Sequence, residues 1–153
     1  MLKGRTRETA IRRDAQGRWF NGPDPITHPN LVQSFDAWLT LAPDGRFCLS
    51  NDINWAYVSI EGPAHFVRGV RVLDGQVELQ LSSGKRELLD PGSLRQGPDG
   101  ALYCDVAGGT LTARFDNAAS AGLSSLLGED EQGVYIAMGE TRVRPPVTDT
   151  PIR

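Results

Sequence analysis

The feature that most constrains the fold of this chain is the frequency of tight-turn signals. Asp-Gly pairs occur at 44–45, 74–75 and 99–100, and the Gln-Gly pairs include those at 16–17 and 132–133. Aspartate tolerates a positive φ and glycine adopts one freely, so such pairs suit hairpins between short strands. The segments around them alternate apolar and polar residues, as strands with one buried face do. The spacing predicts a largely antiparallel protein built from short strands.

The clearest hairpin is VRVLDGQVELQL, residues 70–81. Strand alternation places five apolar residues on one face, namely Val70, Val72, Val77, Leu79 and Leu81. The other face carries Arg71, Glu78 and Gln80. We predict a meander with strands near 67–73, 76–82 and 85–89.

Two segments follow a helical period instead. After Pro29 and a cap at Thr27 or His28, apolar residues recur at steps of three and four, at Leu31, Val32, Phe35, Trp38, Leu39 and Ala42. A second stripe follows a cap at Asp116 or Asn117 and ends at Gly128, and its members are Ala119, Leu123, Leu126 and Leu127. The expected fold class is therefore α+β, with short antiparallel strands and two amphipathic helices.

The two predicted helices have similar neighbours along the chain. DAQGRWF precedes the first and GPDGALY the second, while PDGRFCLSN and DEQGVYIAM follow them. We interpret this as a divergent internal duplication of a strand pair, a helix and a hairpin. The expected organisation is a basic tail over 1–8, an α+β half over 9–66, a meander-plus-helix half over 67–144, and a flexible proline-rich tail over 145–153. A ligand site is expected at the seam between the halves, where a concave surface forms naturally.

Composition narrows the class of partner. The 153 residues are 39% apolar and 23% charged, which is typical of a globular protein, and the net charge of −3 favours neither nucleic acid nor a membrane. The basic N-terminal run is interpreted as a solvated tail, with a phosphate-binding or nucleic-acid-binding arm as the alternative; it comprises Lys3, Arg5, Arg7, Arg12 and Arg13. No leader or membrane-length apolar run is evident, so we expect a soluble cytoplasmic protein of bacterial type.

The chain has no recognisable catalytic or metal motif. Cys48 and Cys104 lie far apart in strand-like runs, and we expect both to be buried free thiols. The two histidines, His28 and His65, have no carboxylate at a metal-site spacing, and GEDEQG at 128–133 is read as a solvated turn. No cofactor, metal site or catalytic residue is predicted. A small enzyme whose Asp, His and Ser residues meet only in space remains an alternative.

The stretch SNDINWAYV, residues 50–58, is a candidate site. Its structural interpretation is a polar hairpin turn followed by aromatic strand residues. Its functional interpretation gives Asn51 and Asn54 the role of hydrogen-bonding a base or sugar, and gives Trp55 the role of stacking on a ring.

Two further residues are candidate anion contacts. His28 stands at the predicted start of a helix, where free N–H groups favour anions, although a purely structural helix start is the main interpretation. Arg114 faces away from Phe115 by strand alternation, and it is expected to meet a phosphate or else to pair with Asp105 or Asp116. Trp19 and Trp38 are assigned to the core.

The chain resembles a bacterial family catalogued as domain of unknown function 1285. The run GRWFNGPDPITHPNLVQSF carries its first signature, at Gly17, Trp19, Phe20, Pro25, Ile26, Pro29, Leu31, Val32 and Phe35. Ile60, Glu61 and Phe66 match a second landmark, and Arg114 matches an arginine of the third. The resemblance runs from about residue 9 to 144. Two positions depart from it: His28 replaces an arginine, and Asn54-Trp55 replaces a Glu-Lys pair.

The resemblance implies duplicated α+β halves, the second loosely like a pleckstrin-homology domain. It also implies a small nucleotide-like ligand at the seam of the halves and a signalling role. The Asn54-Trp55 departure means that this ligand differs or that the site is lost. The leading functional hypothesis is a non-catalytic ligand-binding or signalling module. The main alternative is a protein-interaction module that uses exposed strand edges.

Overall fold

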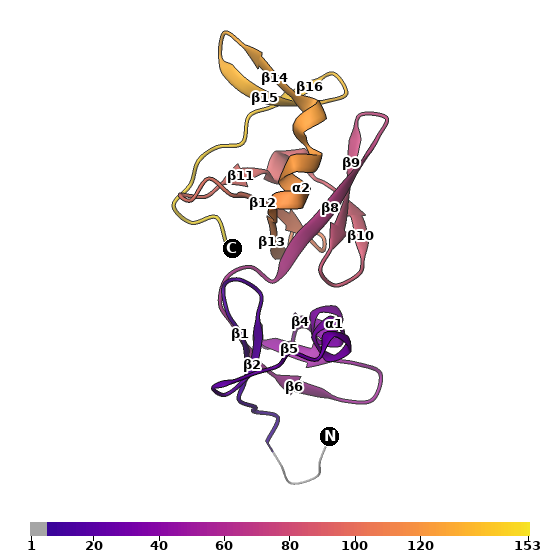
Figure 1. Cartoon of the computed structure of the whole chain (residues 1–153), viewed down its shortest axis with the longest axis vertical. Coiled ribbons are helices and arrows are strands. Elements are labelled where there is room, and N and C mark those ends of the chain that lie inside the picture. The colour runs from indigo at the N-terminus through magenta and orange to yellow at the C-terminus, as the bar shows by residue number, and fades with distance from the viewer. Residues whose placement is uncertain (1–5) are drawn as a thin grey trace. The chain divides into compact units, whose positions relative to one another are not determined.

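The computed structural model describes residues 6–153 and has the α+β architecture expected from the sequence (Figure 1). Lys3 and Arg5 of the basic run lie outside the described residues. The chain divides into two compact units, Met1–Ala64 (unit 1) and His65–Arg153 (unit 2), so the division falls two residues before the expected one. None of the helices in the described part is long and apolar enough to cross a membrane.

Unit 1 consists of one helix and two small sheets. Its elements in order are β1 (Ile11–Arg13), β2 (Trp19–Asn21), β3 (Asp24–Pro25), α1 (Pro29–Trp38), β4 (Leu39–Leu41), β5 (Phe47–Ser50), β6 (Trp55–Tyr57) and β7 (Ser59–Ile60). The first sheet has the order β3-β2-β1-β7, with β1 and β7 parallel, and the second has the order β4-β5-β6. The core between them is the cluster Trp19, Phe35, Leu39, Leu49 and Val58.

Unit 2 is built on one larger sheet. Its elements are β8 (His65–Leu73), β9 (Gln76–Leu81), β10 (Arg86–Leu88), the 3₁₀ turn η1 (Pro91–Ser93), β11 (Arg95–Gln96), β12 (Leu102–Val106), β13 (Leu111–Phe115), α2 (Asn117–Gly122), η2 (Ser124–Leu126), β14 (Leu127–Asp130), β15 (Gly133–Met138) and β16 (Thr141–Val143). The six-stranded sheet has the order β10-β9-β8-β13-β12-β11, with β8 and β13 parallel. A separate meander has the order β14-β15-β16.

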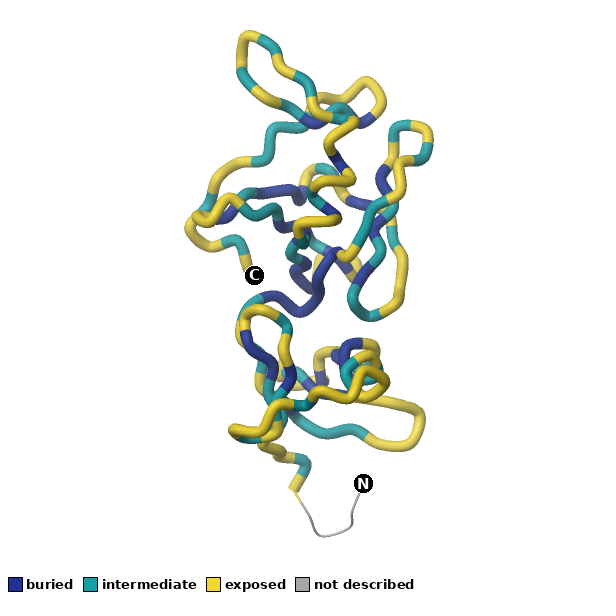
Figure 2. The backbone as a smooth tube through the Cα atoms, viewed as in Figure 1, coloured by how far each residue is buried: buried dark blue, intermediate teal, exposed yellow. Residues whose placement is uncertain are grey.

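The predicted meander of unit 2 is confirmed by β8, β9 and β10. Val70 pairs with Leu79 and Val72 pairs with Val77, so the apolar residues share one face as expected. Asp74 and Gly75 have φ of 43° and 81°, the backbone that a tight two-residue hairpin requires. Buried positions lie along β8, β12 and β13 (Figure 2), where Val67, Cys104 and Ala113 have no exposed surface.

Both helices are shorter than the apolar stripes predicted. The α1 helix ends at Trp38, and the stripe residue Leu39 begins β4. The α2 helix starts after Asp116, whose side chain accepts from the N–H of Ala119 at 2.8 Å, so this cap is confirmed. The rest of its predicted length becomes η2 and β14. Near the end of a helix, apolar residues three or four positions apart can also belong to a buried strand. Pairing with strands that are distant in the sequence decides whether the segment becomes helix or strand.

The order of elements recurs in the two units. A three-strand meander, a helix and a second three-strand meander form β1–β3, α1 and β4–β6 in unit 1, and β11–β13, α2 and β14–β16 in unit 2. This succession matches the duplication inferred from the sequence. The sheet partners differ, because the strand paired in parallel is the first of its meander in unit 1 (β1) and the last in unit 2 (β13).

Candidate ligand-binding hollow

A buried tryptophan in unit 1 forms the floor of the candidate site. Trp19 is 1% exposed, and its indole Nε1–H donates to Asp36 at 2.8 Å. The ring also meets Phe35 edge to face, with centroids 5.3 Å apart. The buried Arg13 guanidinium lies 3.7 Å from the same carboxylate, and it donates to the carbonyls of Pro63 and Ala64. These contacts fix the ring in one orientation.

The turn between β1 and β2 forms one side of the site. Its carboxylate, Asp14, accepts from the backbone N–H groups of Gln16 and Arg18 at 3.0 and 2.8 Å, and from Arg18 Nε at 2.6 Å. Burial raises the pKa of Asp14, but these donors together outweigh burial and hold the pKa below its usual value. Gly17 closes the turn at φ 86°.

The opposite side of the site comes from the chain between β2 and α1. Ile26 returns its N–H to the carbonyl of Trp19 at 2.9 Å, which holds the segment after β3 beside the tryptophan. The α1 helix then starts on the carbonyl of His28, which accepts from Val32 N–H at 3.0 Å. This geometry places Val32 one turn into the helix and in the wall of the same site.

These elements enclose a hollow of about 490 Å³. Its lining is mainly apolar and aromatic, and consists of Gly17, Arg18, Trp19, Phe20, Pro25, Ile26, Thr27 and Val32. Because Trp19 is almost fully buried, it forms the floor, and the less buried side chains form the walls. We refer to this site below as the unit 1 hollow.

The rim of the unit 1 hollow carries one charged lining residue, Arg18, and lies beside the start of a helix. The Arg18 side chain is 70% exposed, and its Nη atoms donate to no residue within 6–153. Thr27 precedes the first turn of α1, and that turn carries no acidic residue. A helix N-terminus has a partial positive charge, so both features favour an anionic group at the rim.

His28 is exposed at the N-cap of α1, and its side chain makes no capping hydrogen bond. The backbone carbonyl of His28 bonds to the first turn of the helix, where it accepts from the N–H groups of Leu31 and Val32. The imidazole does not line the hollow, although the neighbouring Thr27 does. The anion contact predicted for His28 stays a prediction.

The polar turn at residues 51–55 uses its amides internally. Asn51 Oδ1 accepts from the N–H groups of Ile53 and Asn54, both at 2.9 Å, and Asn54 Oδ1 accepts from Trp55 N–H at 2.9 Å. The guanidinium of Arg7 lies 3.9 Å from the centroid of the Trp55 ring. The structure therefore matches the structural interpretation of this turn, and one face of the proposed stacking surface is covered.

Arg114 belongs to unit 2, whereas the other four predicted contact residues belong to unit 1. It donates to Asp99 at 2.9 Å, and not to the expected Asp105 or Asp116. Asp105 instead accepts from Arg95 and Arg153, while Asp116 lies 3.9 Å from Arg68. The predicted ligand position between the halves stays a prediction, and the unit 1 hollow lies within one unit.

The described residues include no cluster of metal-ligating side chains, and both cysteines are buried. No group of three or more His, Cys, Asp or Glu residues within 6–153 is placed to hold a metal ion. Both cysteines are free and buried, as expected, and burial raises the pKa of the Cys104 thiol to about 12. The lining of the hollow is mainly apolar, and Arg18 is its charged residue.

Most residues of the hollow belong to the first family signature, but no site was predicted at these positions from the sequence. Six of its eight lining residues carry the first family signature, namely Gly17, Trp19, Phe20, Pro25, Ile26 and Val32. Trp19 was assigned to the core, which is correct for its burial but omits its place beneath the hollow. The signal available in the sequence was the concentration of aromatic and proline residues within 17–29.

Comparison with known proteins supports the fold. One solved DUF1285 family protein, from Silicibacter pomeroyi, is similar with a TM-score of 0.65 and 19% identity, over 88% of this chain and 78% of that one. Another, from Shewanella baltica, is similar with a TM-score of 0.58 and 14% identity, over 76% of this chain and 91% of that one. No protein family model and no curated protein sequence matches the chain.

The structural likeness covers both units and agrees with the family suggested by the sequence motifs. At these identities, the likeness establishes the architecture and not a shared ligand. The chain has the fold of the solved DUF1285 family proteins.

Proposed function

We propose that the chain is a non-catalytic ligand-binding module whose unit 1 hollow takes a small ring-bearing anion. This class includes nucleotide-like molecules and aromatic carboxylates, and it agrees with the signalling role that the family resemblance implies. The observation that carries the proposal is a mainly apolar hollow whose lining includes one charged residue, Arg18.

The size and lining of the hollow support a small molecule. Ligand pockets usually enclose about 300–1,000 Å³ and combine apolar walls with a few polar groups. The unit 1 hollow, at about 490 Å³, lies within that range. Its floor is held by the hydrogen bond from Trp19 to Asp36, so a ligand would meet a preformed surface.

The rim supports an anionic group on that ligand. Arg18 Nε is held by Asp14 at 2.6 Å, which anchors the side chain while the Nη atoms extend from the turn. A guanidinium fixed at Nε can still donate from its Nη atoms to a carboxylate or phosphate. The uncompensated N-terminus of α1 adds positive potential on the Thr27 side.

A thermal unfolding screen tests the proposal. All three tryptophans, Trp19, Trp38 and Trp55, lie in unit 1, so tryptophan fluorescence reports on that unit alone. The probes are adenosine monophosphate, 2-naphthoate and the neutral 2-naphthalenemethanol. We expect at least one of the two anions, at tenfold excess over its Kd, to raise the midpoint by about 2 °C or more, and the neutral ring to have a smaller effect.

The Arg18→Gln variant tests the rim. It keeps the aliphatic stem and a polar end group but removes the guanidinium, so the affinity for the bound anion should fall about tenfold. Arg86→Gln is the matched control, because Arg86 is exposed on β10 in unit 2. No stabilisation by any probe, or equal affinity in Arg18→Gln and Arg86→Gln, would contradict the proposal.

A further inference from the structure

The C-terminal segment, residues 145–153, lies along the edge of the large sheet in unit 2 (Figure 1). Gln96 on β11 donates its N–H to the carbonyl of Pro146 at 2.8 Å, and its own carbonyl accepts from Thr148 N–H at 2.9 Å. These two bonds form a parallel bridge between Gln96 and Val147. The proline-rich segment therefore pairs with the sheet edge through one isolated bridge, because Pro146 contributes only its carbonyl and the N–H needed comes from Thr148.

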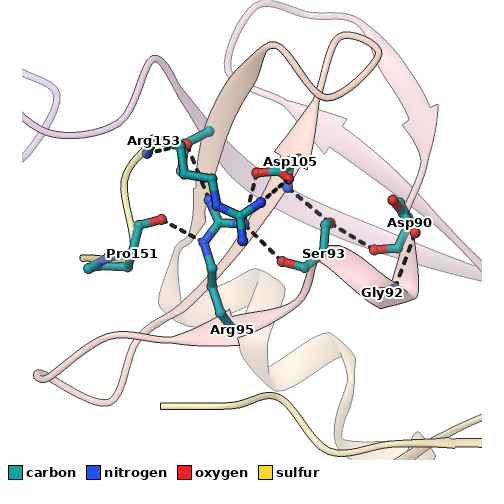
Figure 3. A network of polar contacts seen from close by, with 8 residues as sticks. Asp90, Gly92, Ser93, Arg95, Asp105, Pro151 and Arg153 are labelled. Carbon is teal, nitrogen blue, oxygen red and sulfur yellow. Dashed lines mark hydrogen bonds and ion pairs between the residues drawn. The ribbon is translucent and has the colours of Figure 1, made fainter. Parts of the chain in front are cut away.

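A second set of contacts holds the far end of the segment, and Figure 3 shows them converging on one arginine. The Arg95 side chain is 3% exposed, and it donates to the carbonyl of Pro151 at 2.6 Å and to Asp105 at 2.8 Å. The other carboxylate oxygen of Asp105 accepts from the Arg153 guanidinium at 2.7 Å. Thr112 Oγ1 accepts from Arg153 N–H at 3.0 Å.

Glycine at position 97 leaves room for the Pro151 ring. A Cβ atom at Gly97 would lie 3.2 Å from Pro151 Cγ and 2.8 Å from Tyr103 Cε1. Any larger residue there would press against both rings. Unit 2 thus presents a shaped socket for a proline, a strand edge at Gln96 and a carboxylate at Asp105.

The segment is tied at both ends but not packed along its length. A cavity of about 250 Å³ lies where the segment meets unit 2, and its lining includes Arg95, Thr148 and Thr150. Val147 and Ile152 remain 71% and 41% exposed. The segment therefore buries little apolar surface, which is the main source of stability for an integral strand. Such a segment opens by local unfolding more readily than the core strands do.

We propose that this edge of unit 2 is a peptide-binding site, and that residues 145–153 occupy it as an intramolecular ligand. Its partner is an extended segment of another protein that adds a strand at Gln96, places a proline over Gly97 and brings an arginine to Asp105. Main-chain pairing at a sheet edge with side-chain pockets alongside is a common mode of peptide recognition. The chain's own segment shows the chemistry that such a partner needs.

Hydrogen exchange on the unaltered full chain is the first test. If the segment opens locally, the amides of Gln96 and Thr148 should exchange at least about 100-fold faster than that of Ala113 in the same sheet. Equal exchange of the three amides would show that the segment unfolds only with the whole unit, and would overturn the proposal. This test needs no variant and is independent of the unit 1 hollow.

Binding of a labelled peptide, PPVTDTPIR, to full-length variants is the second test. The attached segment competes at an effective concentration near the millimolar range, so the unaltered chain should bind the peptide weakly. The double variant Thr148→Pro/Arg153→Glu loses the N–H bonded to Gln96 and reverses the charge facing Asp105. We expect it to bind the peptide at least tenfold more tightly.

Matched controls separate this effect from loss of structure. The double variant Thr148→Ala/Arg86→Glu keeps that N–H and makes the same charge change on exposed β10, so its affinity should equal that of the unaltered chain. A peptide whose final arginine is glutamate should not bind. Failure of the peptide to bind the folded opened variant would overturn the proposal. Light scattering would also detect a dimer in which two copies exchange their C-terminal segments. That result would overturn the proposed partner, because the occupant would be a second copy of the chain and not another protein.

Discussion

Two tryptophans of unit 1, Trp19 and Trp55, differ in their surroundings: Trp19 is buried in the core, as expected, and Trp55 is half-buried beside a polar turn. Trp55 follows a polar turn and looked like a ligand-stacking residue, whereas Trp19 looked like core. In the structure, Arg7 covers Trp55 at 3.9 Å, and Trp19 is the floor of a hollow of about 490 Å³.

The difference teaches that polar groups in a sequence are available for a ligand only if local structure leaves them free. The side-chain oxygens of Asn51 and Asn54 accept hydrogen bonds from N–H groups of their own turn. Around Trp19, in contrast, Asp36 takes the indole N–H and the apolar walls stand apart. The candidate hollow forms because the side chains around Trp19 come from turns and a helix start and do not fill the space between them.

The largest effect should come from removing the guanidinium beneath Trp19. Arg13 is 1% exposed and contacts Asp36 and the carbonyls of Pro63 and Ala64. Breaking a buried charge pair costs about 3–5 kcal/mol, so Arg13→Met should lower the stability of unit 1 by about this amount. Urea denaturation followed by tryptophan fluorescence measures it. A loss below about 1 kcal/mol would show that the floor does not depend on Arg13.

A smaller effect should separate the two tryptophans directly. Trp19→Phe removes the donor to the buried Asp36, which should cost about 1–3 kcal/mol and weaken any ligand in the hollow. Trp55→Phe, the matched change on the covered aromatic, should cost about 1 kcal/mol or less, since a phenyl ring keeps part of the contacts with Arg7 and Tyr57 and no buried donor is lost. Equal losses in the two variants would remove the distinction between the regions.

Acidification should weaken the turn that borders the hollow. The pKa of Asp14 is lowered in the folded protein, so its stabilising contribution is present above the unfolded pKa of about 3.9 and is lost as pH falls through the folded value. Asp14→Asn should cost about 1 kcal/mol at pH 6 and less at pH 2, where part or all of the charge contribution is lost. Urea denaturation at both pH values tests this. The same cost at both would show that the charge of Asp14 is unimportant.

The smallest effect should come from uncovering Trp55. Arg7→Gln removes a cation that stacks on a partly exposed ring, a contact worth about 0.5–1 kcal/mol. The hydrogen bond that Arg7 donates to the Trp55 carbonyl at 2.8 Å is lost as well, so the free energy of unfolding should fall by about 1 kcal/mol in total, while quenching of the fluorescence by acrylamide should increase. If ligand binding improved in Arg7→Gln, the turn at 51–55 would be a masked site after all.

Much of the fold could be predicted because turn chemistry and alternation act locally. The Asp74–Gly75 hairpin, the start of α1 at Pro29 and the Asp116 cap all depend on neighbouring residues. The early end of α1 could not be predicted, because Leu39 satisfies both a helical stripe and a strand paired with Leu49. Only long-range pairing decides between the two.

The candidate sites depend on contacts that no local pattern encodes. The pairing of Arg114 with Asp99 spans 15 residues, and the bond from Arg95 to Pro151 spans 56. The proline-rich tail looked unable to join a sheet, yet one parallel bridge at Val147 needs an N–H only from Thr148. The likeness of unit 2 to a pleckstrin-homology domain stays a prediction.

Titration of the ¹⁵N-labelled chain with 2-naphthoate or adenosine monophosphate tests the central claim most directly. Each of the three tryptophans gives one indole N–H signal in the spectrum, so the two regions are observed together. We predict that the Trp19 signal shifts with saturation while the Trp55 signal stays in place. A saturable shift of Trp55 with Trp19 unchanged would contradict the account, as would no saturable shift of either signal.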